Sequence, residues 1–401
     1  MRIAHRIKEL HELPHGLAHI PSIIKVKNWY AQSFKDLTGF PAPRLPESIQ
    51  RQLATLSMSE DPVEVRPNPS LQGDDLFSES EFKSHLDSTG ALVRRTPVLA
   101  QRDYARLSEI NWPPEVEDYN EQFTRCLERI KRRHDGVVTT LAQGVLEYTR
   151  ATANRKEKKA DVQRFLDRFY MSRIGIRFLI GQQIALGRSI AAPKGGALER
   201  IAGAFEGTKP EGEYVGIICT DANIGKLAHE AIENARFVCE EHYDLFSAPP
   251  VQLVCPHDLT FMYAPSHLNH MLFELLKNSL RAVVERYGSD CDDYPPIKVI
   301  VVEGQEDITI KISDEGGGIP RSEVPMAWTY MYTTAQPEDL DPDFQSSDFQ
   351  APMAGFGYGL PLARLYARYF GGDLNLISME SYGTDVYLHL NRLSSSSEPL
   401  P

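Results

Sequence analysis

The spacing of hydrophobic residues changes near residue 214, and this change constrains the fold more than any other feature of the chain. Upstream of it, apolar residues recur at helical spacing over residues 1–40 and 116–186. Downstream, helical segments alternate with β-branched runs. The expected elements are helices at 224–242, 266–287 and 360–370, a strand at 251–255, a hairpin of strands at 297–302 and 308–312, and strands at 373–378 and 384–390. We therefore predict an α+β protein with an all-α helical bundle of four-helix type over 1–190, followed by an α/β sandwich over 214–393 with helices on one face of a sheet.

Three stretches lack periodicity and separate or flank these units. Residues 58–114 are rich in Ser, Asp, Glu, Pro and Gly, which predicts a mostly disordered insertion. Residues 191–213 are rich in Gly, Ala and Pro and predict a flexible linker. The serine-rich residues 394–401 predict a disordered tail. The linker marks the expected domain boundary.

Composition excludes several functional classes. The 401 residues include 43 Lys and Arg against 55 Asp and Glu, a net charge of −12, which argues against a nucleic-acid binder that neutralises phosphates. The five cysteines form no C-x-x-C pair, so neither a disulfide framework nor a cysteine-rich zinc site is indicated. No apolar run reaches the roughly 18 residues of a transmembrane segment, and the amphipathic opening residues show no secretory pattern.

One predicted helix carries a polar stripe. At about 100° per residue, His270, Glu274, Asn278 and Arg281 fall on one side of the helix at 266–287, with Lys277 beside them. An amide oxygen such as that of Asn278 suits Mg²⁺, and Glu274 is suited to orient a hydroxyl nucleophile. The alternative is an exposed helix face with an acid and amide pair one turn apart.

Two glycine-rich turns flank the following strands and helix. Asp314, Gly316 and Gly318 end a predicted strand, where a carboxylate can accept a hydrogen bond from the adenine amine and glycines allow close approach of a flat ligand. A plain tight turn is the alternative. Thr384 opens the last strand and is a weaker candidate for the same base.

The second turn opens directly into a helix, so its backbone N–H groups are suited to bind phosphate. Its candidate residues are Gly355, Phe356, Gly357, Tyr358, Gly359 and Leu360. The polar, acidic residues 326–354 before it predict a lid that orders over a nucleotide, with Thr333 and Thr334 as further candidate ligands; a solvated loop is the alternative.

These motifs, in this order, resemble the GHKL (Bergerat) superfamily of ATP-binding domains. Residues 265–278 and 355–372, together with 2–8, 132–135, 142–144 and 172–177 of the bundle, more narrowly resemble the mitochondrial pyruvate dehydrogenase kinases, and the 58–114 insertion resembles fungal forms. The resemblance implies a protein kinase that phosphorylates serines on the pyruvate dehydrogenase α subunit. It implies Asn278 for Mg²⁺, Asp314, Gly318 and Thr384 for adenine, residues 355–360 for phosphates, and Glu274 as base, tuned by His270. Lys277 and Arg281 are assigned to phosphate charge by position alone.

The resemblance also implies partners and a location. It implies a homodimer, binding to the lipoyl domain of the dihydrolipoyl acyltransferase core, K⁺ as a further cofactor, and the mitochondrial matrix. Lys131, His134 and Arg177 lie where the family builds a small-carboxylate regulatory pocket, although a core histidine with satisfied hydrogen bonds is the alternative for His134.

Three other functions stay open. A branched-chain α-ketoacid dehydrogenase kinase shares every ATP motif. A sensor histidine kinase would phosphorylate its own helical histidine, for which the His134–Asp135 pair is the only superficial match. A GHKL conformational ATPase would use hydrolysis to drive a clamp, but its ATP domain normally comes first.

Overall fold

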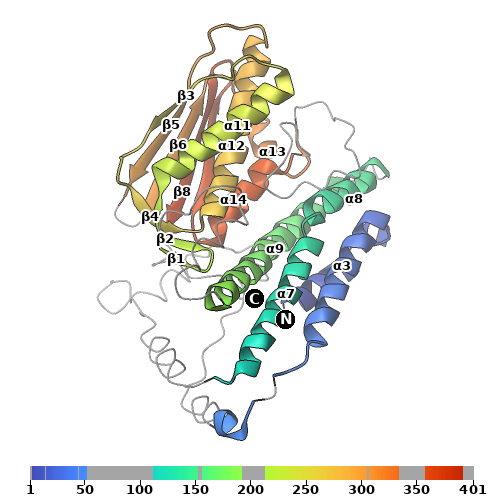
Figure 1. Ribbon diagram of the computed structural model, residues 1–401. Helices are drawn as coiled ribbons and strands as arrows, with labels where there is room; N and C mark the ends of the chain where they lie inside the picture. The colour runs from blue at the N-terminus through green and yellow to red at the C-terminus, as the bar shows by residue number, and fades with distance from the viewer. Residues whose placement is uncertain are drawn as a thin grey trace, which may run out of the picture.

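The computed structural model describes residues 2–13, 15–43, 45–51, 112–151, 156–191, 213–304, 307–333 and 357–391. Most of the predicted insertion and linker, the last part of the predicted lid and the predicted tail lie outside these residues. An all-helical part lies beside a part in which helices cover a sheet (Figure 1). The α+β prediction is therefore confirmed.

In the helical part, residues 47–51 are helical, and one short and five longer helices are described besides them. They are α1 (Arg2–His11), α2 (His15–Ala18), α3 (Pro21–Thr38), α7 (Pro114–Arg133), α8 (Val137–Ala151) and α9 (Lys156–Ala191). Both α3 and α7 begin with proline, whose fixed φ and missing N–H suit a first helical position. Fully buried residues that recur at helical spacing fill the space between the helices, among them Ile23, Ile130, Leu141 and Phe169.

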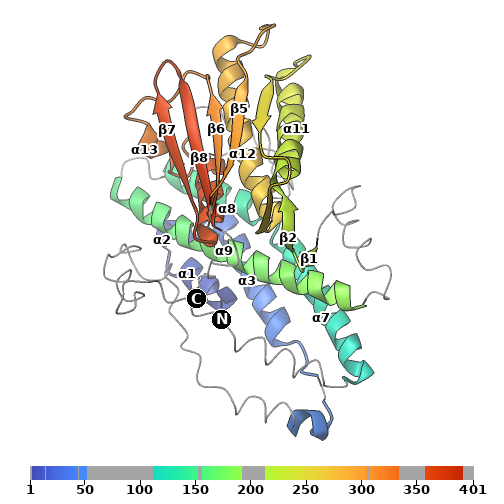
Figure 2. The ribbon, with the colours of Figure 1, turned by 90° about the vertical axis from the view of Figure 1, so that its left-hand side faces the viewer.

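The longest helix joins the two parts. With 36 residues, α9 extends for about 54 Å, and it passes beneath the strands of the second part (Figure 2). Its Phe178 ring lies 5.7 Å from the ring of His267 and 5.3 Å from that of Phe370. The Gln182 amide bonds to the carbonyl of Val215 and the N–H of Ile217, each at 2.9 Å. The helical part is thus packed directly on the second part.

The main sheet has the strand order β3-β5-β6-β8-β7. Its strands are β3 (Val251–Val254), β5 (Ile297–Glu303), β6 (Asp307–Asp314), β7 (Asp373–Met379) and β8 (Gly383–Asn391). The predicted hairpin is confirmed, because β5 and β6 are antiparallel with Val301 opposite Ile310. Helices α11 (Ile224–Tyr243), α12 (Pro265–Tyr287) and α14 (Gly359–Tyr369) lie on one face of this sheet (Figure 1). On β6, Ile308, Ile310 and Ile312 are fully buried, which is the alternation expected of a strand with one covered face.

A second, smaller sheet was not predicted. It has the order β1-β2-β4 and consists of β1 (Tyr214–Val215), β2 (Ile218–Asn223) and β4 (Thr260–Tyr263). These strands have two to six residues, and β2 contains a register shift between Cys219 and Ala222. Such short strands carry too little alternation to be recognised in a sequence. A four-residue helix, α13 (Val324–Ala327), was also missed.

No helix within the described ranges is both long and apolar enough to cross a membrane.

Candidate active site

The polar stripe of α12 is buried rather than exposed. His270 and Glu274 each keep 6% of their surface accessible and Lys277 keeps 3%, whereas Asn278 is exposed. Helix α14 covers this part of α12. Its Tyr366 ring lies edge-on to the His270 ring, with the ring centroids 4.9 Å apart. The alternative of a solvated helix face is therefore wrong for His270 and Glu274. Buried titratable groups that line a cleft are typical of functional sites.

The Glu274 carboxylate is held between a cation and a helix start. Its Oε1 atom lies 3.0 Å from Lys277 Nζ. On the other side, the backbone of Gly359, the first residue of α14, approaches so closely that a Cβ atom there would lie 2.2 Å from Glu274 Oε2. The N-terminus of a helix carries partial positive charge, so the carboxylate of Glu274 faces positive charge from both Lys277 and α14. An acid suited to position a hydroxyl nucleophile thus lies beside a helix start suited to bind phosphate, and phosphoryl transfer uses both.

Four of the six residues predicted to hold phosphate are described. Gly357 has φ +74°, and a Cβ atom there would lie 2.3 Å from the carbonyl oxygen of Tyr332, so only glycine fits. Tyr358 turns its side chain into the protein, and Gly359 and Leu360 begin α14. Among the other predicted nucleotide ligands, Thr333 is exposed; Gly355, Phe356 and Thr334 lie outside the described residues.

The predicted adenine site is built around a buried carboxylate at the end of β6. Asp314 Oδ1 accepts hydrogen bonds from the N–H groups of Gly316 at 2.9 Å and Thr384 at 3.3 Å, and Oδ2 accepts one from Ser279 Oγ at 3.1 Å. Burial raises the pKa of Asp314 despite these three donors. A carboxylate oxygen has two lone pairs, so Asp314 can still accept the amine of a base.

Glycines in the turn after β6 are required by its geometry. Gly318 has φ +70°, and a Cβ atom there would lie 2.1 Å from the carbonyl oxygen of Met379. At Gly316 a Cβ atom would lie 2.5 Å from that of Ala282 on α12. The turn therefore packs directly on α12, as both the adenine-site prediction and the plain-turn alternative require.

Three residues that support this region were not found from the sequence. Ser279 bonds Asp314, Ser378 Oγ lies 3.0 Å from Thr384 Oγ1, and Arg286 donates to the carbonyls of Glu315 and Ser381 at 2.8 and 3.0 Å. Each contact joins segments at least six residues apart and up to 95 apart, and no local sequence pattern signals it.

Arg281, which was predicted to balance phosphate charge, directs Nε toward Glu285 at 2.9 Å. Tyr243 of α11 also bonds Glu285. The guanidinium of Arg281 therefore pairs with Glu285 on the side of α12 that faces α11. The structure brings together His270, Glu274 and Lys277 with Gly359, and separately Asp314, Gly316, Gly318 and Thr384.

Both groups of residues lie against α12. From Ser279 beside Asp314 to Glu274 beside Gly359 the rise along α12 is about 7.5 Å, and the exposed Asn278 lies between them. The Asn278 amide oxygen is available there for Mg²⁺, which takes few protein ligands besides phosphate oxygens. These residues therefore fit ATP and Mg²⁺.

The predicted regulatory residues lie together in the bundle. His134 is 1% exposed, stacks on Tyr30 with ring centroids 4.4 Å apart, and has Nε2 3.0 Å from Ser33 Oγ. Burial, and next the Arg173 charge, lowers the pKa of His134 to about 3. This environment agrees with the alternative of a satisfied, neutral core histidine. Arg177 donates to Asp135 at 2.9 Å. Burial, and next the charge of Arg177, lowers the pKa of Lys131.

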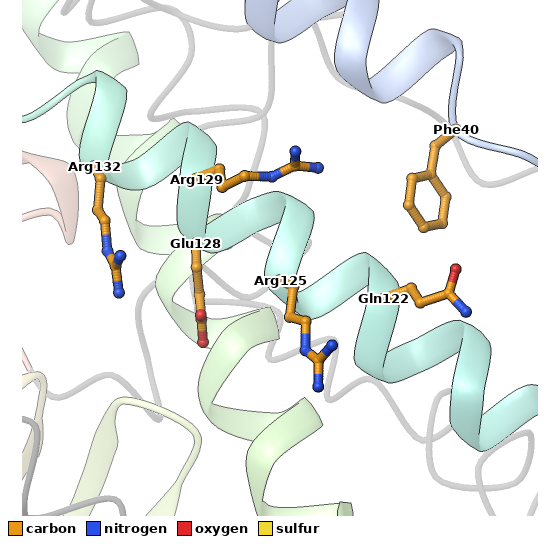
Figure 3. A pocket seen from close by; sticks show the side chains of 6 residues that line it. All are labelled: Phe40, Gln122, Arg125, Glu128, Arg129 and Arg132. Carbon is orange, nitrogen blue, oxygen red and sulfur yellow. The ribbon is translucent and has the colours of Figure 1, made fainter.

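An open cavity of about 460 Å³ lies elsewhere on the bundle (Figure 3). Its lining comes from α7 and from Phe40, two residues after the end of α3. The lining residues are Phe40, Gln122, Arg125, Glu128, Arg129 and Arg132. None of the three predicted regulatory residues lines it.

The one-sided sheet, the buried acid on α12 and the two glycine turns define the second part as a GHKL-type ATP-binding domain. Residues 263–394 match the family model described as "Histidine kinase-, DNA gyrase B-, and HSP90-like ATPase". Residues 1–219 match the model described as "Mitochondrial branched-chain alpha-ketoacid dehydrogenase kinase".

Three relatives align with the whole chain. The "[Pyruvate dehydrogenase (acetyl-transferring)] kinase, mitochondrial" of Schizosaccharomyces pombe is 45% identical over 100% of this chain and 88% of the relative. The protein of the same name in Arabidopsis thaliana is 37% identical over 100% of this chain and 84% of the relative. The "[Pyruvate dehydrogenase (acetyl-transferring)] kinase isozyme 3, mitochondrial" of Homo sapiens is 34% identical over 100% of this chain and 78% of the relative. The chain therefore belongs to the family of the mitochondrial pyruvate dehydrogenase kinases.

Proposed function

We propose that the protein is a mitochondrial serine kinase that transfers phosphate from MgATP to the pyruvate dehydrogenase α subunit and so inactivates that enzyme. The observation that carries this proposal is the Glu274 carboxylate, buried between Lys277 and the glycine start of α14. The names of the 45% and 37% identical relatives support the choice of substrate.

Each residue of the site has a proposed role. Asp314 and Thr384 bind the adenine, with Gly316 and Gly318 leaving room for it. The backbone of Gly357, Tyr358, Gly359 and Leu360, together with Gly355 and Phe356, donates N–H groups to the phosphates, and Thr333 and Thr334 add hydroxyl donors. Asn278 holds Mg²⁺, which neutralises charge on the phosphate oxygens. Lys277 adds positive charge beside Glu274, and Arg281 adds it from farther along α12, where it also pairs with Glu285.

Glu274 orients the substrate serine and takes its proton. The serine Oγ forms a bond to the γ-phosphorus as the bond from that phosphorus to the β-γ bridging oxygen breaks; the proton passes to Glu274 and then to solvent. His270, one turn earlier on α12, tunes this carboxylate. Because phosphoryl transfer depends on alignment and charge neutralisation, these groups are sufficient.

The test is transfer of labelled phosphate from ATP to purified pyruvate and branched-chain dehydrogenase components, side by side. We expect acid-stable phosphoserine on the pyruvate dehydrogenase α subunit. Preferred labelling of the branched-chain component would instead support a branched-chain α-ketoacid dehydrogenase kinase, the enzyme for which the family model matching residues 1–219 is named. Acid-labile label on the chain itself would indicate a histidine kinase, and hydrolysis without transfer a conformational ATPase.

The acid is tested by replacement with its amide. Glu274→Gln should abolish transfer and preserve ATP binding, because it removes the basic carboxylate and keeps the shape. Glu230→Gln, at an exposed position of α11, is the matched control and should leave transfer unchanged. Transfer at the normal rate by Glu274→Gln would refute the assignment.

The partners and location are also proposals from family resemblance. We propose a homodimer; Val302 on β5 and Ile377 and Met379 on the edge strand β7 are 56–60% exposed, which favours an apolar contact at the sheet. Light scattering tests it, with a monomeric mass as the contrary result. Binding of the protein to an immobilised lipoyl domain tests that partner. Import into isolated mitochondria followed by matrix fractionation tests the location, and a comparison of transfer rates in KCl and NaCl tests K⁺ as a cofactor.

We also propose that Lys131, His134 and Arg177 bind a small carboxylate that regulates the kinase. The neighbouring cations Lys131 and Arg177, joined by a hydrogen bond from Arg177 to the Lys131 carbonyl at 3.4 Å, support this. Inhibition by small carboxylates should weaken in Arg177→Gln, and unchanged inhibition would contradict the proposal.

A further inference from the structure

One residue of the predicted lid, Tyr330, is held by the helical part of the protein. On α9, Gln163 pairs with its backbone: the Tyr330 N–H donates to Gln163 Oε1 at 2.8 Å, and Gln163 Nε2 donates to the Tyr330 carbonyl at 3.2 Å. One turn later, Asp167 Oδ1 accepts a hydrogen bond from the Tyr330 hydroxyl at 2.8 Å. Three hydrogen bonds from a single turn of α9 therefore fix one residue that is more than 160 positions away.

An aromatic cluster strengthens this anchor. The Tyr330 ring lies 5.6 Å from that of Tyr170 on α9 and 5.2 Å from that of Tyr358, and Tyr170 and Tyr358 are 5.8 Å apart. Tyr330 and Tyr358 are only 3% and 5% exposed. The described segments that precede residue 334 and follow residue 356 thus both contact Tyr170 of α9.

The anchor leads directly to the reactive carboxylate. The N–H of Met331, the next residue, donates to the Gly357 carbonyl at 3.2 Å. Two residues beyond Gly357, the backbone of Gly359 touches Glu274 Oε2. A continuous series of contacts therefore runs from Gln163 and Asp167 to the start of α14 and to the acid on α12.

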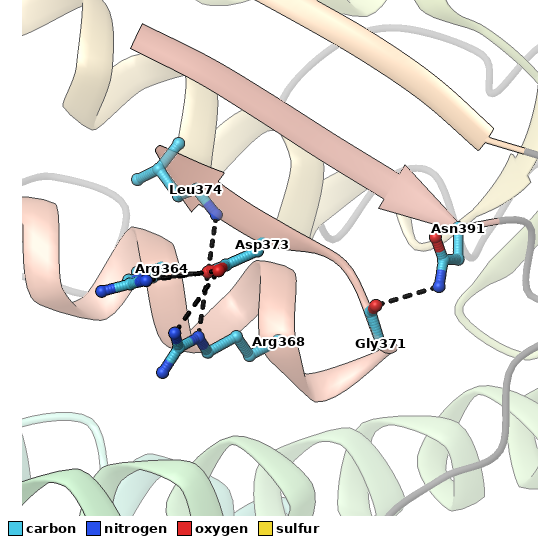
Figure 4. Close-up of polar contacts among 6 residues, drawn as sticks. All are labelled: Arg364, Arg368, Gly371, Asp373, Leu374 and Asn391. Atoms are coloured by element: carbon cyan, nitrogen blue, oxygen red, sulfur yellow. Dashed lines mark hydrogen bonds and ion pairs between the residues drawn. The ribbon is translucent and has the colours of Figure 1, made fainter. Parts of the chain in front are cut away.

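The later turns of α14 are held by β7. Asp373, the first residue of β7, lies 2.9 Å from Nε of both Arg364 and Arg368 (Figure 4). The Arg364 guanidinium also lies 4.5 Å from the ring centroid of Trp328, two residues before Tyr330. Because β7 holds the later turns of α14, a change at Tyr330 acts on its first residues.

We propose that Gln163 and Asp167 are positioning residues for phosphoryl transfer: through Tyr330 they hold residues 357–359 at the nucleotide phosphates and against Glu274. Neither residue is part of the proposed nucleotide site, and both lie on α9 of the helical part. The inference rests on the proposed function, because it assigns Glu274 and the start of α14 to catalysis and phosphate binding.

The test compares variants of α9 in the full-length protein. Gln163→Leu removes two of the three hydrogen bonds at similar volume, and Asp167→Ala removes the third. We expect each to lower kcat about ten-fold and to weaken binding of ADP several-fold by calorimetry, with KM for the dehydrogenase component unchanged, since a hydrogen bond is worth several-fold in an equilibrium. Asp167→Asn still accepts from the Tyr330 hydroxyl and should stay within about two-fold of the parent.

Two further proteins separate positioning from stability. Asp161→Ala, at an exposed site six residues before Asp167 on α9, is the matched control and should have parental kinetics. The double variant Asp167→Ala with Tyr330→Phe should lose no more activity than the worse single variant, because both changes remove the same hydrogen bond.

The inference is overturned if Gln163→Leu and Asp167→Ala keep parental kcat and ADP affinity. It is also overturned if Asp167→Asn is as impaired as Asp167→Ala, or if Asp161→Ala is equally impaired. Should the parent protein itself transfer no phosphate to any dehydrogenase component, the proposed function fails, whereas the ADP affinities still decide whether α9 positions the nucleotide site.

Discussion

Replacing Gly359 by alanine isolates the contact between α14 and Glu274. The backbone of Gly359 accepts any residue as the first residue of a helix, because its φ is not positive. The added Cβ atom would lie 2.2 Å from Glu274 Oε2, where non-bonded atoms need more than about 3 Å. Glu274 is 6% exposed and lies at 3.0 Å from Lys277, so its carboxylate has little free space. The substitution therefore forces the carboxylate to move by about 1 Å.

A displacement of about 1 Å in a catalytic group costs about 100-fold in rate, or about 2.7 kcal/mol in the activation free energy. The assay is single-turnover transfer from ATP to the dehydrogenase α subunit, with ADP affinity measured in parallel. We expect kcat to fall about 100-fold while ADP binding weakens much less, because the backbone that meets the phosphates is retained.

Gly181→Ala on α9 is the matched control. A Cβ atom there makes only ordinary contact with Ile217 at 3.5 Å, and alanine in a helix interior stabilises by about 0.5–1 kcal/mol. Its transfer rate should equal that of the parent. A Gly359→Ala protein with parental kcat would refute the placement of Glu274 beside α14 in the reacting state.

Three further predictions concern the nucleotide and the buried histidines. Asn278→Ala should weaken nucleotide binding at least ten-fold with Mg²⁺ and leave binding in EDTA nearly unchanged; equal losses in both would contradict the metal role. Gly318→Ala should destabilise the protein by about 2 kcal/mol or more and abolish ADP binding, because it combines a positive φ with a Cβ atom 2.1 Å from the Met379 carbonyl; a parental thermal transition would contradict this. Burial lowers the pKa of His134 and His267 to about 3, so the unfolded chain takes up protons below pH 6.5 that the folded chain does not. The free energy of unfolding should therefore fall as pH decreases from about 6.5 toward 3, by up to about 1.4 kcal/mol per pH unit for each histidine, and His134→Gln should reduce that slope in denaturation measured at pH 7.5 and 5. An unchanged slope would contradict the assignment.

The local patterns of the chain were sufficient for most of the fold. The β5 and β6 hairpin was predicted because β-branched residues alternate over both strands, and α12 because its apolar residues keep helical spacing over 23 residues. The sheet β1-β2-β4 was missed because β2 pairs with β4 across some 40 residues and neither strand is longer than six residues. Pairing at such a distance leaves no periodicity in a short segment.

The residue types of the site were predictable, but their environment was not. The glycines at 316, 318, 357 and 359 and the acid at 274 were selected from spacing and chemistry. The burial of Glu274 depends on α14, whose first residue is 85 positions away, so the sequence alone left an exposed helix face as an alternative. Gln163 and Asp167 contact Tyr330 across 167 and 163 residues of sequence, respectively. No local pattern in either segment predicts these contacts.

The most direct test of the account is a crystal structure of the protein with Mg²⁺ and a non-hydrolysable ATP analogue. We predict the adenine amine within hydrogen-bonding distance of Asp314, the metal on the Asn278 amide oxygen, and the γ-phosphate between Glu274 and residues 357–360. A nucleotide bound anywhere else, or a γ-phosphate out of reach of a serine hydroxyl placed at Glu274, would contradict the central claim.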